Sequence, residues 1–495
     1  MEIITTWGPL AITLCYTVVA CVLGFSAKGR LDMNRVENWS SSGNTMGLIV
    51  MIFLTGAGNV SAYTFLGAPG WAFSKGVASL YVVVYLGFIC YTSYLISPRV
   101  TRLALKNGYR TQAEGIGARF ESKGLRMLCG IVGAVAVLGN SLVQIIGCGH
   151  ILNVMSHGVI PMWLGELIIL CAVAFYVYSS GLRAIGWTNV MQGVMMLILS
   201  LTVALFIMYT VLGSFSVGEA FSRLLTESPE HLTLPGAAGD FPPIFWTTSI
   251  LISVVSFWPQ FWVFAAGAKD EDTVRKQYTY VSLFYLVMVP MLIVGFICVF
   301  AFGNYDGEVD KVALTFCLEK LPWWMVGLLG AGILAAAQSS AEPQLHTPAF
   351  TFTHDVIAPA KNIPPEKEGK IQRKVFLVVV FAVAYPLALT NPAELVYILL
   401  VCYGFIGQLF PCMLGVFCWP RATKAGAIAG LTAGVIIVAL FNFVWANPLY
   451  VHAGIWGLLV NFPVFIIVSL LTKPASEETL RKFFPDYIMD MLYEE

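Results

Sequence analysis

Residues 335–345, AAAQSSAEPQL, place two hydroxyls and one carboxyl group inside a long apolar run. Ser339 and Ser340 are adjacent, and Glu342 follows two positions later. Oxygen atoms of this kind are the ligands that hard cations prefer. An isolated serine in a membrane helix usually bonds back to the preceding turn, but an ionisable group at membrane depth marks a functional site by default. The stretch therefore predicts a cation site.

Residues 54–70, LTGAGNVSAYTFLGAPG, interrupt a second apolar run with four glycines, a proline and an Asn-Val-Ser triplet. Backbone groups freed from a helix here would cost several kcal/mol each, about 2–7, if they faced lipid. Close helix packing explains some membrane glycines. A second break, SFWPQFW with Pro259, lies in the span 243–267. Breaks at matching places in two halves, 46–213 and 243–418, indicate a transporter site at the interface of inverted repeats.

The composition predicts that membrane helices hold these residues in place. The 495 residues are 58% hydrophobic and 11% charged, whereas a soluble protein averages about 25% charged residues. Most of the apolar runs reach the roughly 20 residues that a membrane helix needs. We predict an all-α polytopic membrane protein with about thirteen spans, near 8–27, 46–73, 77–97, 127–155, 162–180, 187–213, 243–267, 278–302, 323–350, 374–390, 395–418, 425–446 and 454–472.

The basic residues orient the predicted helices. With the N-terminus outside, 24 of the 28 Lys and Arg residues fall in inner loops, and the other four (Lys75, Arg223, Lys311, Lys320) fall outside. This asymmetry follows the positive-inside rule and predicts a cytoplasmic C-terminus in a plasma or inner membrane. Residues 1–472 form one transmembrane domain in this interpretation. Residues 473–495 are a short cytoplasmic tail, interpreted as an amphipathic helix on the membrane surface.

Several other functions find little support in the chain. Lys plus Arg equals Asp plus Glu, so the charge balance indicates no nucleic-acid partner. An enzyme would need a convergent set of catalytic side chains, and Glu342 stands nearly alone. No Cys-x-x-Cys or His/Cys metal spacing occurs. We therefore expect no enzyme, and a membrane sensor is disfavoured because no kinase or partner domain is appended.

Four stretches together resemble the sodium:solute symporter family. They are NVSAYTFLGAPGWAFSKG (59–76), YSSGLRAIGWTNVMQG (178–193), AAAQSSAEPQL (335–345) and QLFPCMLGVFCWPRATKAGAIAGLTAG (408–434). The resemblance covers about residues 8–440. It implies a LeuT-like core of two inverted five-helix repeats, with one leading and two trailing helices. The motif His354-Asp355 is similar to a helix terminus of the family, with a structural role.

The resemblance also implies a sodium site between the first and eighth core helices. By motif position, the ligands are the backbone carbonyls of Ala57, Val60 and Ala336 and the hydroxyls of Ser339 and Ser340. A second ion or proton site is implied at Asn189 and Glu342, where the sequence departs from the family. Asn189 stands where some relatives have an aspartate, and Glu342 stands where a relative has a hydroxyl. Two alternatives stay open: the negative charge has moved across the interface, or Glu342 carries a proton.

The resemblance places solute contacts on core helices one, two, three, six and ten. The polar or aromatic candidates within apolar spans are Asn59, Ser61, Tyr63, Thr64, Gln144, Phe257, Gln260 and Tyr403. Sugar-transporting relatives carry a Glu-Gln pair where this chain has Tyr63-Thr64, and sialic-acid relatives carry an arginine near Gln144, so both solutes are disfavoured.

The predicted function is sodium-coupled import of a small organic solute by alternating access. The solute classes are a monocarboxylate, a vitamin such as pantothenate, or an amino acid. The expected partners are this solute, the sodium ion and the lipid bilayer, and a monomer is the expected state. The alternative is a proton-coupled symporter of the same fold that uses Glu342.

Overall fold

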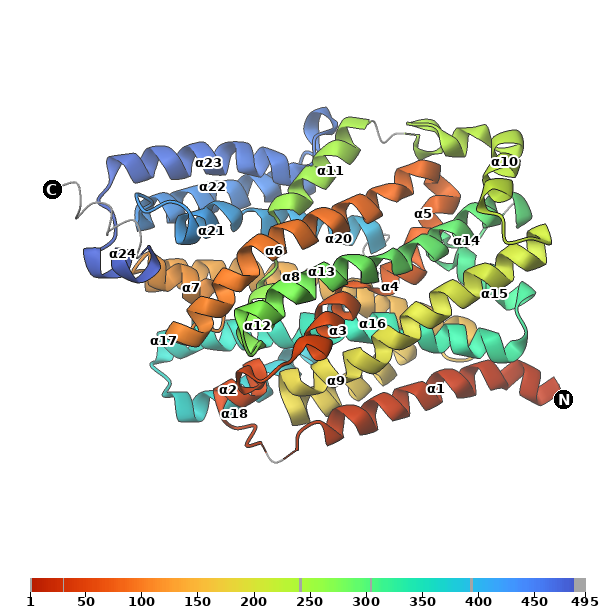
Figure 1. Cartoon of the computed structure of the whole chain (residues 1–495), viewed down its shortest axis with the longest axis horizontal. Helices are drawn as coiled ribbons and strands as arrows, with labels where there is room; N and C mark the ends of the chain where they lie inside the picture. The colour runs from red at the N-terminus through yellow and green to blue at the C-terminus, as the bar shows by residue number, and fades with distance from the viewer. Residues whose placement is uncertain (1, 30, 240–242, 303–304, 392–394, 485–495) are drawn as a thin grey trace.

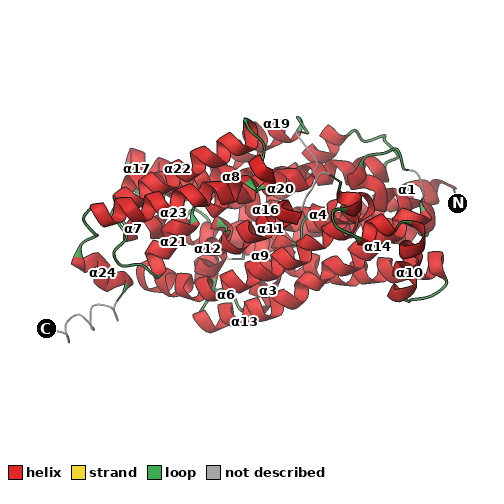
Figure 2. Ribbon diagram, turned by 90° about the horizontal axis from the view of Figure 1, so that it is seen from above, coloured by secondary structure: helices red, strands yellow, loops and turns green. Residues whose placement is uncertain are grey.

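The computed structural model is an elongated helical bundle (Figures 1 and 2). It describes residues 2–29, 31–239, 243–302, 305–391 and 395–484. Within these ranges every regular element is a helix, and one isolated bridge joins Met46 to Ala268. The polar backbone of a segment in lipid must satisfy its own hydrogen bonds, and a helix does so within one segment. The predicted all-α class is therefore confirmed.

Eleven helical stretches of the described chain are long and apolar enough to cross a membrane. The main helices are α1 (Glu2–Ser26), α6 (Tyr81–Asn107), α8 (Lys123–Met155), α9 (Met162–Leu212), α13 (Glu271–Phe284), α14 (Met288–Ala301), α16 (Trp323–Thr351), α18 (Pro365–Val378), α20 (Leu395–Gly407), α21 (Phe410–Phe417), α22 (Lys424–Phe443) and α23 (Ala453–Leu471). Two other spans are broken into shorter pieces: α3 (Leu48–Asn59), α4 (Ala62–Phe65) and α5 (Gly67–Lys75), and then α11 (Pro243–Val255) and α12 (Pro259–Gly267).

The difference between the thirteen predicted spans and the eleven membrane-length helical stretches has two causes. The span 46–73 is broken, so its first part, α3, is too short to count alone. The spans 162–180 and 187–213 form the 51-residue α9, which would measure about 77 Å if straight. It is not straight, because Gly181 has φ 55° and ψ −145°. A Cβ there would lie 2.2 Å from the Trp39 carbonyl oxygen, so only glycine fits this turn.

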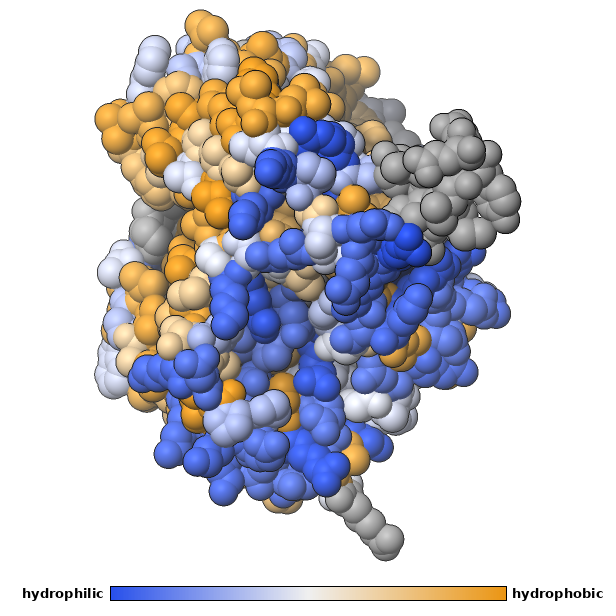
Figure 3. Space-filling view, turned by 90° about the vertical axis from the view of Figure 1, so that its left-hand side faces the viewer, coloured by the Kyte–Doolittle hydropathy of each residue, from blue (hydrophilic) through white to orange (hydrophobic). Residues whose placement is uncertain are grey.

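Short helices cover the two ends of the bundle. At the left-hand end of Figure 1 lie α2 (Val36–Ser41), α7 (Gln112–Arg119), α17 (Ala358–Lys361) and α24 (Glu477–Phe483). At the right-hand end lie α10 (Val217–Glu227) and α15 (Val312–Lys320), which carry Glu219, Glu227 and Glu319. We call the left-hand end the basic end. Figure 3 looks onto it and shows a broad hydrophilic surface with a hydrophobic zone above it.

The tail begins as the predicted short helix. Thr479 of α24 donates a hydrogen bond to Glu121 at 2.5 Å, and Phe483 stacks on Tyr109 with ring centroids 6.1 Å apart. The helix therefore packs at the basic end, and the rest of the predicted amphipathic segment, residues 485–495, lies outside the described residues.

Helix α16 is the centre of the bundle. It packs against α1, α3, α8 and α9, and every residue from Leu329 to Thr351 is buried. Its small residues permit this density: a Cβ on Gly332 would lie 2.7 Å from Leu199 of α9. Ser339, Ser340 and Glu342 are consequently held on a rigid helix inside the protein.

Candidate ion and solute site

The first helix break is held open by a side chain from another helix. After α3 ends at Asn59, Val60 and Ser61 are extended, with φ −85° and −99°. The amide of Ala62, which begins α4, donates to Gln144 Oε1 of α8 at 3.0 Å. Gly147 lies one turn further along α8, and a Cβ on it would be 2.4 Å from the Ala62 Cβ. The missing side chain therefore lets α8 approach the break.

The second break, between α11 and α12, is organised by proline. Pro259 is the first residue of α12, where its missing N–H costs no hydrogen bond. The carbonyl of Phe257, inside the break, accepts from Gln112 Nε2 at 3.2 Å. Ser256 Oγ donates to the Ile252 carbonyl at 2.7 Å. Both breaks are therefore buried in protein and stabilised by polar side chains.

Three of the five predicted sodium ligands meet directly. Ser339 Oγ donates to the Ala57 carbonyl at 2.9 Å and to the Ala336 carbonyl at 3.0 Å. Ser340 Oγ is buried and has no hydrogen-bond partner among the described residues. Val60 is the residue at which the backbone leaves the helix. All five residues are fully buried, so the site offers only oxygen atoms in a dry environment, which suits a hard cation.

Glu342 sits at the interface of α9 and α16 and accepts three hydrogen bonds. Tyr176 donates at 2.5 Å, Thr188 at 2.6 Å and Gln192 at 3.1 Å. The residue is fully buried, and no Lys, Arg or His of the described chain forms an ion pair with it. Three donors and no counter-cation make this carboxyl group a candidate site for a second cation.

Asn189 lies beside the first site and forms no hydrogen bond with Glu342 in the described chain. Its Nδ2 is 3.4 Å from the carbonyl oxygens of both Leu54 and Ser339, while its Oδ1 has no partner in the described part of the chain. A Cβ on Gly58 would lie 3.4 Å from Asn189 Nδ2. Asn189 therefore ties α9 to the place where α3 and α16 meet.

Five residues of this network were not predicted as site residues, namely Tyr16, Tyr176, Thr188, Gln192 and Gln338. Gln192 Nε2 donates to the hydroxyl of Tyr16 at 2.8 Å, and Tyr16 donates to Gln338 Oε1 at 2.8 Å. The leading helix α1 therefore reaches the Glu342 region. The signal for Gln338 was present in the sequence, because Gln338 and Glu342 are four residues apart and so share a helix face; Tyr16 carried no such signal.

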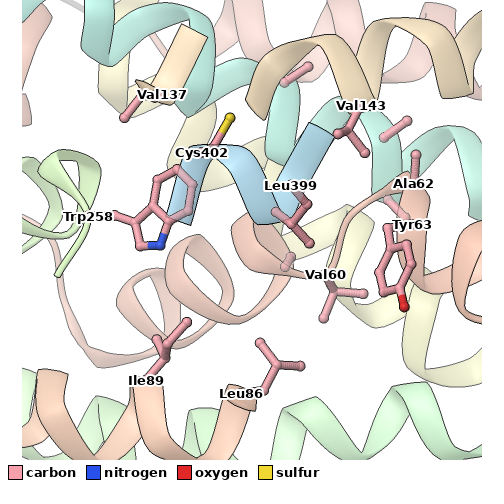
Figure 4. Packing of buried hydrophobic residues seen from close by; sticks show 14 of the residues in the cluster. Val60, Ala62, Tyr63, Leu86, Ile89, Val137, Val143, Trp258, Leu399 and Cys402 are labelled. Atoms are coloured by element: carbon pink, nitrogen blue, oxygen red, sulfur yellow. The ribbon is translucent and has the colours of Figure 1, made fainter. Parts of the chain in front are cut away.

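A small cavity lies between the two breaks. Four of the eight predicted solute residues line it, namely Asn59, Ser61, Gln260 and Tyr403. The rest of the wall, which the sequence analysis missed, is Tyr85, Leu86, Ile89, Asn140, Trp258, Phe261, Gln344 and Leu399. Figure 4 shows the apolar part, with Leu86 and Ile89 facing Leu399 and Trp258. The volume of about 20 Å³ holds about one water molecule, so a solute must push the walls apart.

The other four predicted solute residues lie outside this wall. Gln144 is used by the first break, and Phe257 packs edge-on against Phe261 with ring centroids 5.9 Å apart. Tyr63 and Thr64 are buried within α4. Among the missed residues, Gln344 belongs to the same motif as Ser339 and has the clearest sequence signal. Trp258 and Phe261 belong to the predicted second break, SFWPQFW, whereas Tyr85 and Asn140 reach the cavity only through the folding of α6 and α8 around it.

Charged side chains form a network at the basic end. Arg126 of α8 pairs with Asp355 at 2.7 Å, in the π-helical segment Phe352–Ile357 that follows α16. His354 contacts Glu368 of α18 at 2.6 Å and Glu114 of α7 at 3.2 Å. The motif His354-Asp355 thus joins four elements, which agrees with the structural role expected from the sequence.

Glu114 keeps its charge over the working pH range. Burial alone would raise its pKa, but His354 and Arg126 beside it hold the pKa at about 2, below the ordinary value of 4.5. A carboxyl group with a lowered pKa stabilises the fold fully above its unfolded pKa, and this contribution is lost as the pH falls towards 2. Any pH dependence of function near neutrality therefore comes from another group.

Known proteins resemble this chain over most of its length. The model of the sodium:solute symporter family matches residues 40–434. The chain is 27% identical to the uncharacterized symporter YhjB of Bacillus subtilis, over 94% of this chain and 98% of that protein. It is 25% identical to the sodium/pantothenate symporter of Escherichia coli, over 95% and 98%.

One solved structure shows the same fold. It is a Na⁺-coupled sialic acid symporter, with a TM-score of 0.79 at 17% identity, covering 95% of this chain and 99% of that one. The predicted LeuT-like core is confirmed. The matched relatives are transporters, which confirms the prediction that the chain is not an enzyme.

Proposed function

Since the chain belongs to the sodium:solute symporter family, we propose that it is a sodium-coupled importer of a small organic solute. One observation carries this proposal: Ser339 of α16 bonds to the Ala57 carbonyl at the broken end of α3, beside the Ser340 hydroxyl, which has no partner in the described chain. A sodium ion would be held by Ala57, Val60, Ala336, Ser339 and Ser340, and would join α3 to α16.

The solute binds in the cavity between the two breaks. Asn59 and Ser61 flank Val60 in the chain, so a sodium ion that fixes the end of α3 also fixes two residues of the solute wall. Sodium binding thereby favours solute binding, and by linkage the solute favours sodium to the same extent. Each sodium ion moved inward supplies about 2.3 kcal/mol per 100 mV of membrane potential.

Alternating access requires the two ends to open in turn. In this proposal the basic end is cytoplasmic, as the distribution of Lys and Arg indicates. The Arg126–Asp355 pair and the His354 contacts then hold the cytoplasmic end together, and they must separate before solute and sodium leave.

Glu342 is the proposed site of a second cation. Its carboxyl group accepts three hydrogen bonds without a paired side-chain cation in the described chain, so sodium or a proton would neutralise it. Proton coupling through Glu342 is the second candidate function. The solute classes remain a monocarboxylate, a vitamin such as pantothenate, or an amino acid, and the sodium/pantothenate relative supports the vitamin.

Uptake into proteoliposomes tests the proposal. Liposomes containing the protein receive an inward sodium gradient, an inward proton gradient or neither, with choline replacing sodium, and a mixture of candidate solutes outside. Mass spectrometry of the washed vesicles identifies what accumulates relative to protein-free liposomes. We expect accumulation that requires sodium. Accumulation driven by protons alone would support the second candidate, and no accumulation under any gradient would contradict symport.

A further inference from the structure

The wall of the solute cavity carries amide groups and no formal charge. Among the described residues that line it are four carboxamides, Asn59, Asn140, Gln260 and Gln344, and none is Lys, Arg, His, Asp or Glu. Asn140, Gln260 and Gln344 are at most 6% exposed. They come from three different helices, α8, α12 and α16. A polar wall built in this way recognises its ligand by hydrogen bonds instead of charge pairing.

Among the described residues, three of these amide groups have an oxygen atom without a partner, while Gln260 Nε2 donates to Asn59 Oδ1 at 3.4 Å. Asn140 Oδ1, Gln260 Oε1 and Gln344 Oε1 are buried without a hydrogen-bond partner in the described chain. A buried acceptor without a donor costs free energy, so a bound solute that supplies donors stabilises this arrangement. Each carboxamide also carries two N–H donors. The ligand best matched to such a wall presents both N–H and C=O groups, whichever way each amide is turned.

Aromatic rings complete the wall. Tyr85 and Trp258 both pack against Tyr403, with ring centroids 5.5 Å and 5.1 Å apart and interplanar angles of 72° and 88°. A flat group that enters between these rings gains contact with their faces. The cavity of about 20 Å³ must widen for this, and a thin planar group needs the least widening.

A carboxylate fits this wall poorly. No cationic side chain among the described lining residues is available to pair with it, and burying an unpaired charge is costly. Its positive partners would be a sodium ion held beside Asn59 and the partial charge at the amino end of α12, which begins after Trp258.

We infer that the transported solute is a small uncharged molecule with a flat amide or ureide group. This inference rests on the proposed function, because it assigns the solute of the same site, and it replaces the three carboxylate-bearing classes predicted from the sequence. Asn140, Gln260 and Gln344 bind the N–H and C=O groups of the solute, while Tyr85, Trp258 and Tyr403 cover its faces.

Matched pairs of probes separate the amide from the carboxylate. Nicotinamide is compared with nicotinate, uracil with orotate, and panthenol with pantothenate, because the members of each pair differ mainly in one carboxylate. The protein in proteoliposomes receives each radiolabelled probe with an inward sodium gradient or with choline, and the thermal unfolding midpoint is recorded with each probe in sodium chloride. We expect the uncharged member of at least one pair to accumulate and to raise the midpoint, and its acid to do neither.

Variants connect this result to the wall. Gln344→Leu and Asn140→Leu should each raise the concentration for half-maximal uptake of the accumulated amide about tenfold, the loss expected for one buried hydrogen bond. Asn442→Leu is the matched control, because Asn442 bonds to Val438 within α22, away from the cavity wall; it should leave uptake unchanged. An equal effect of all three variants would overturn the assignment of these amides.

The remaining outcomes separate a failure of the amide assignment from a failure of the proposed function. Sodium-driven uptake confined to the acids, or to simple monocarboxylates such as pyruvate, would overturn the amide assignment and leave the proposed function intact. Sodium-dependent stability without a response to any amide or ureide probe would also overturn it. Failure of sodium to affect either stability or uptake would instead contradict the proposed function.

Discussion

Ser340 tests the sodium site at the scale of one hydroxyl. Because its Oγ is buried without a partner in the described residues, Ser340→Ala removes no hydrogen bond and relieves a cost of about 1–3 kcal/mol. We predict that the thermal unfolding midpoint without sodium is unchanged or higher, while the sodium concentration for half-maximal stabilisation rises about tenfold.

Ser339→Ala provides the comparison, since the Ser339 hydroxyl donates its one proton to the carbonyls of Ala57 and Ala336. Its loss should lower the midpoint without sodium and also raise the sodium concentration for half-maximal stabilisation. An unchanged sodium response in Ser340→Ala would remove this hydroxyl from the site.

Glu342→Gln tests the second cation. Glutamine keeps the size of the side chain and removes the charge, and it offers one acceptor oxygen where the carboxyl group accepts from Tyr176, Thr188 and Gln192. We predict fewer cations moved per cycle. A fall in the sodium Hill coefficient would identify the second cation as sodium, and a lost pH dependence of uptake with an unchanged coefficient would identify it as a proton. If neither property changes, the role of Glu342 is structural.

Single residues were predictable where one motif contains the site. Ser339, Ser340 and Glu342 lie within four residues of chain, and their types and depth were sufficient to predict a cation site there. The solute wall has no such local signature. Asn140 and Tyr85 are ordinary polar residues of apolar helices, and only the tertiary arrangement brings them to the cavity. Gln144 shows the converse: its polarity at depth predicted a ligand, but it bonds to the freed amide of Ala62.

At the scale of elements, the close approach of α8 to the first break is testable. A Cβ on Gly147 would lie 2.4 Å from the Cβ of Ala62, so Gly147→Val forces α8 away from α4. We predict a loss of about 1–3 kcal/mol, the usual cost of overpacking, and reduced uptake because Gln144 no longer reaches the Ala62 amide. Gly87→Ala is the control: no atom lies within 4 Å of its added Cβ, so it should be neutral or stabilising. Equal midpoints for the two variants would contradict this packing.

The charged network at the basic end gives a second prediction at the scale of helices. Arg126→Gln leaves the fully buried Asp355 without its ion-pair partner. Breaking a buried ion pair costs about 3–5 kcal/mol. We predict a clearly lower unfolding midpoint, partly restored in the double variant Arg126→Gln/Asp355→Asn.

The exposed pair of Arg223 and Glu227 supplies the control, since Arg223→Gln should change stability by less than about 1 kcal/mol. Similar losses in Arg126→Gln and Arg223→Gln would show that the buried pair does not hold the basic end together.

At the scale of the whole molecule, hydropathy and charge predicted most of the architecture. Each of the thirteen apolar runs corresponds to helix, and the short helices of the predicted inner loops and tail, α2, α7, α17 and α24, lie at one end of the bundle. The sequence did not predict that α9 is one continuous helical stretch. The polar and small residues around Arg183 are typical of a loop, whereas in the structure the chain turns only at Gly181 within α9. The sequence therefore defines the spans well, and their exact joints depend on contacts such as that with Trp39.

Thermal unfolding of the purified protein in sodium chloride and in choline chloride, at equal ionic strength, tests the central claim most directly, since it requires no knowledge of the solute. An ion that binds only the folded state stabilises it by RT ln(1 + [Na⁺]/Kd), about 2.7 kcal/mol at one hundred times Kd. We predict a sodium-specific rise in the thermal unfolding midpoint. Potassium should not produce this rise, and Ser340→Ala should weaken it. Identical midpoints in sodium, potassium and choline would contradict the sodium site.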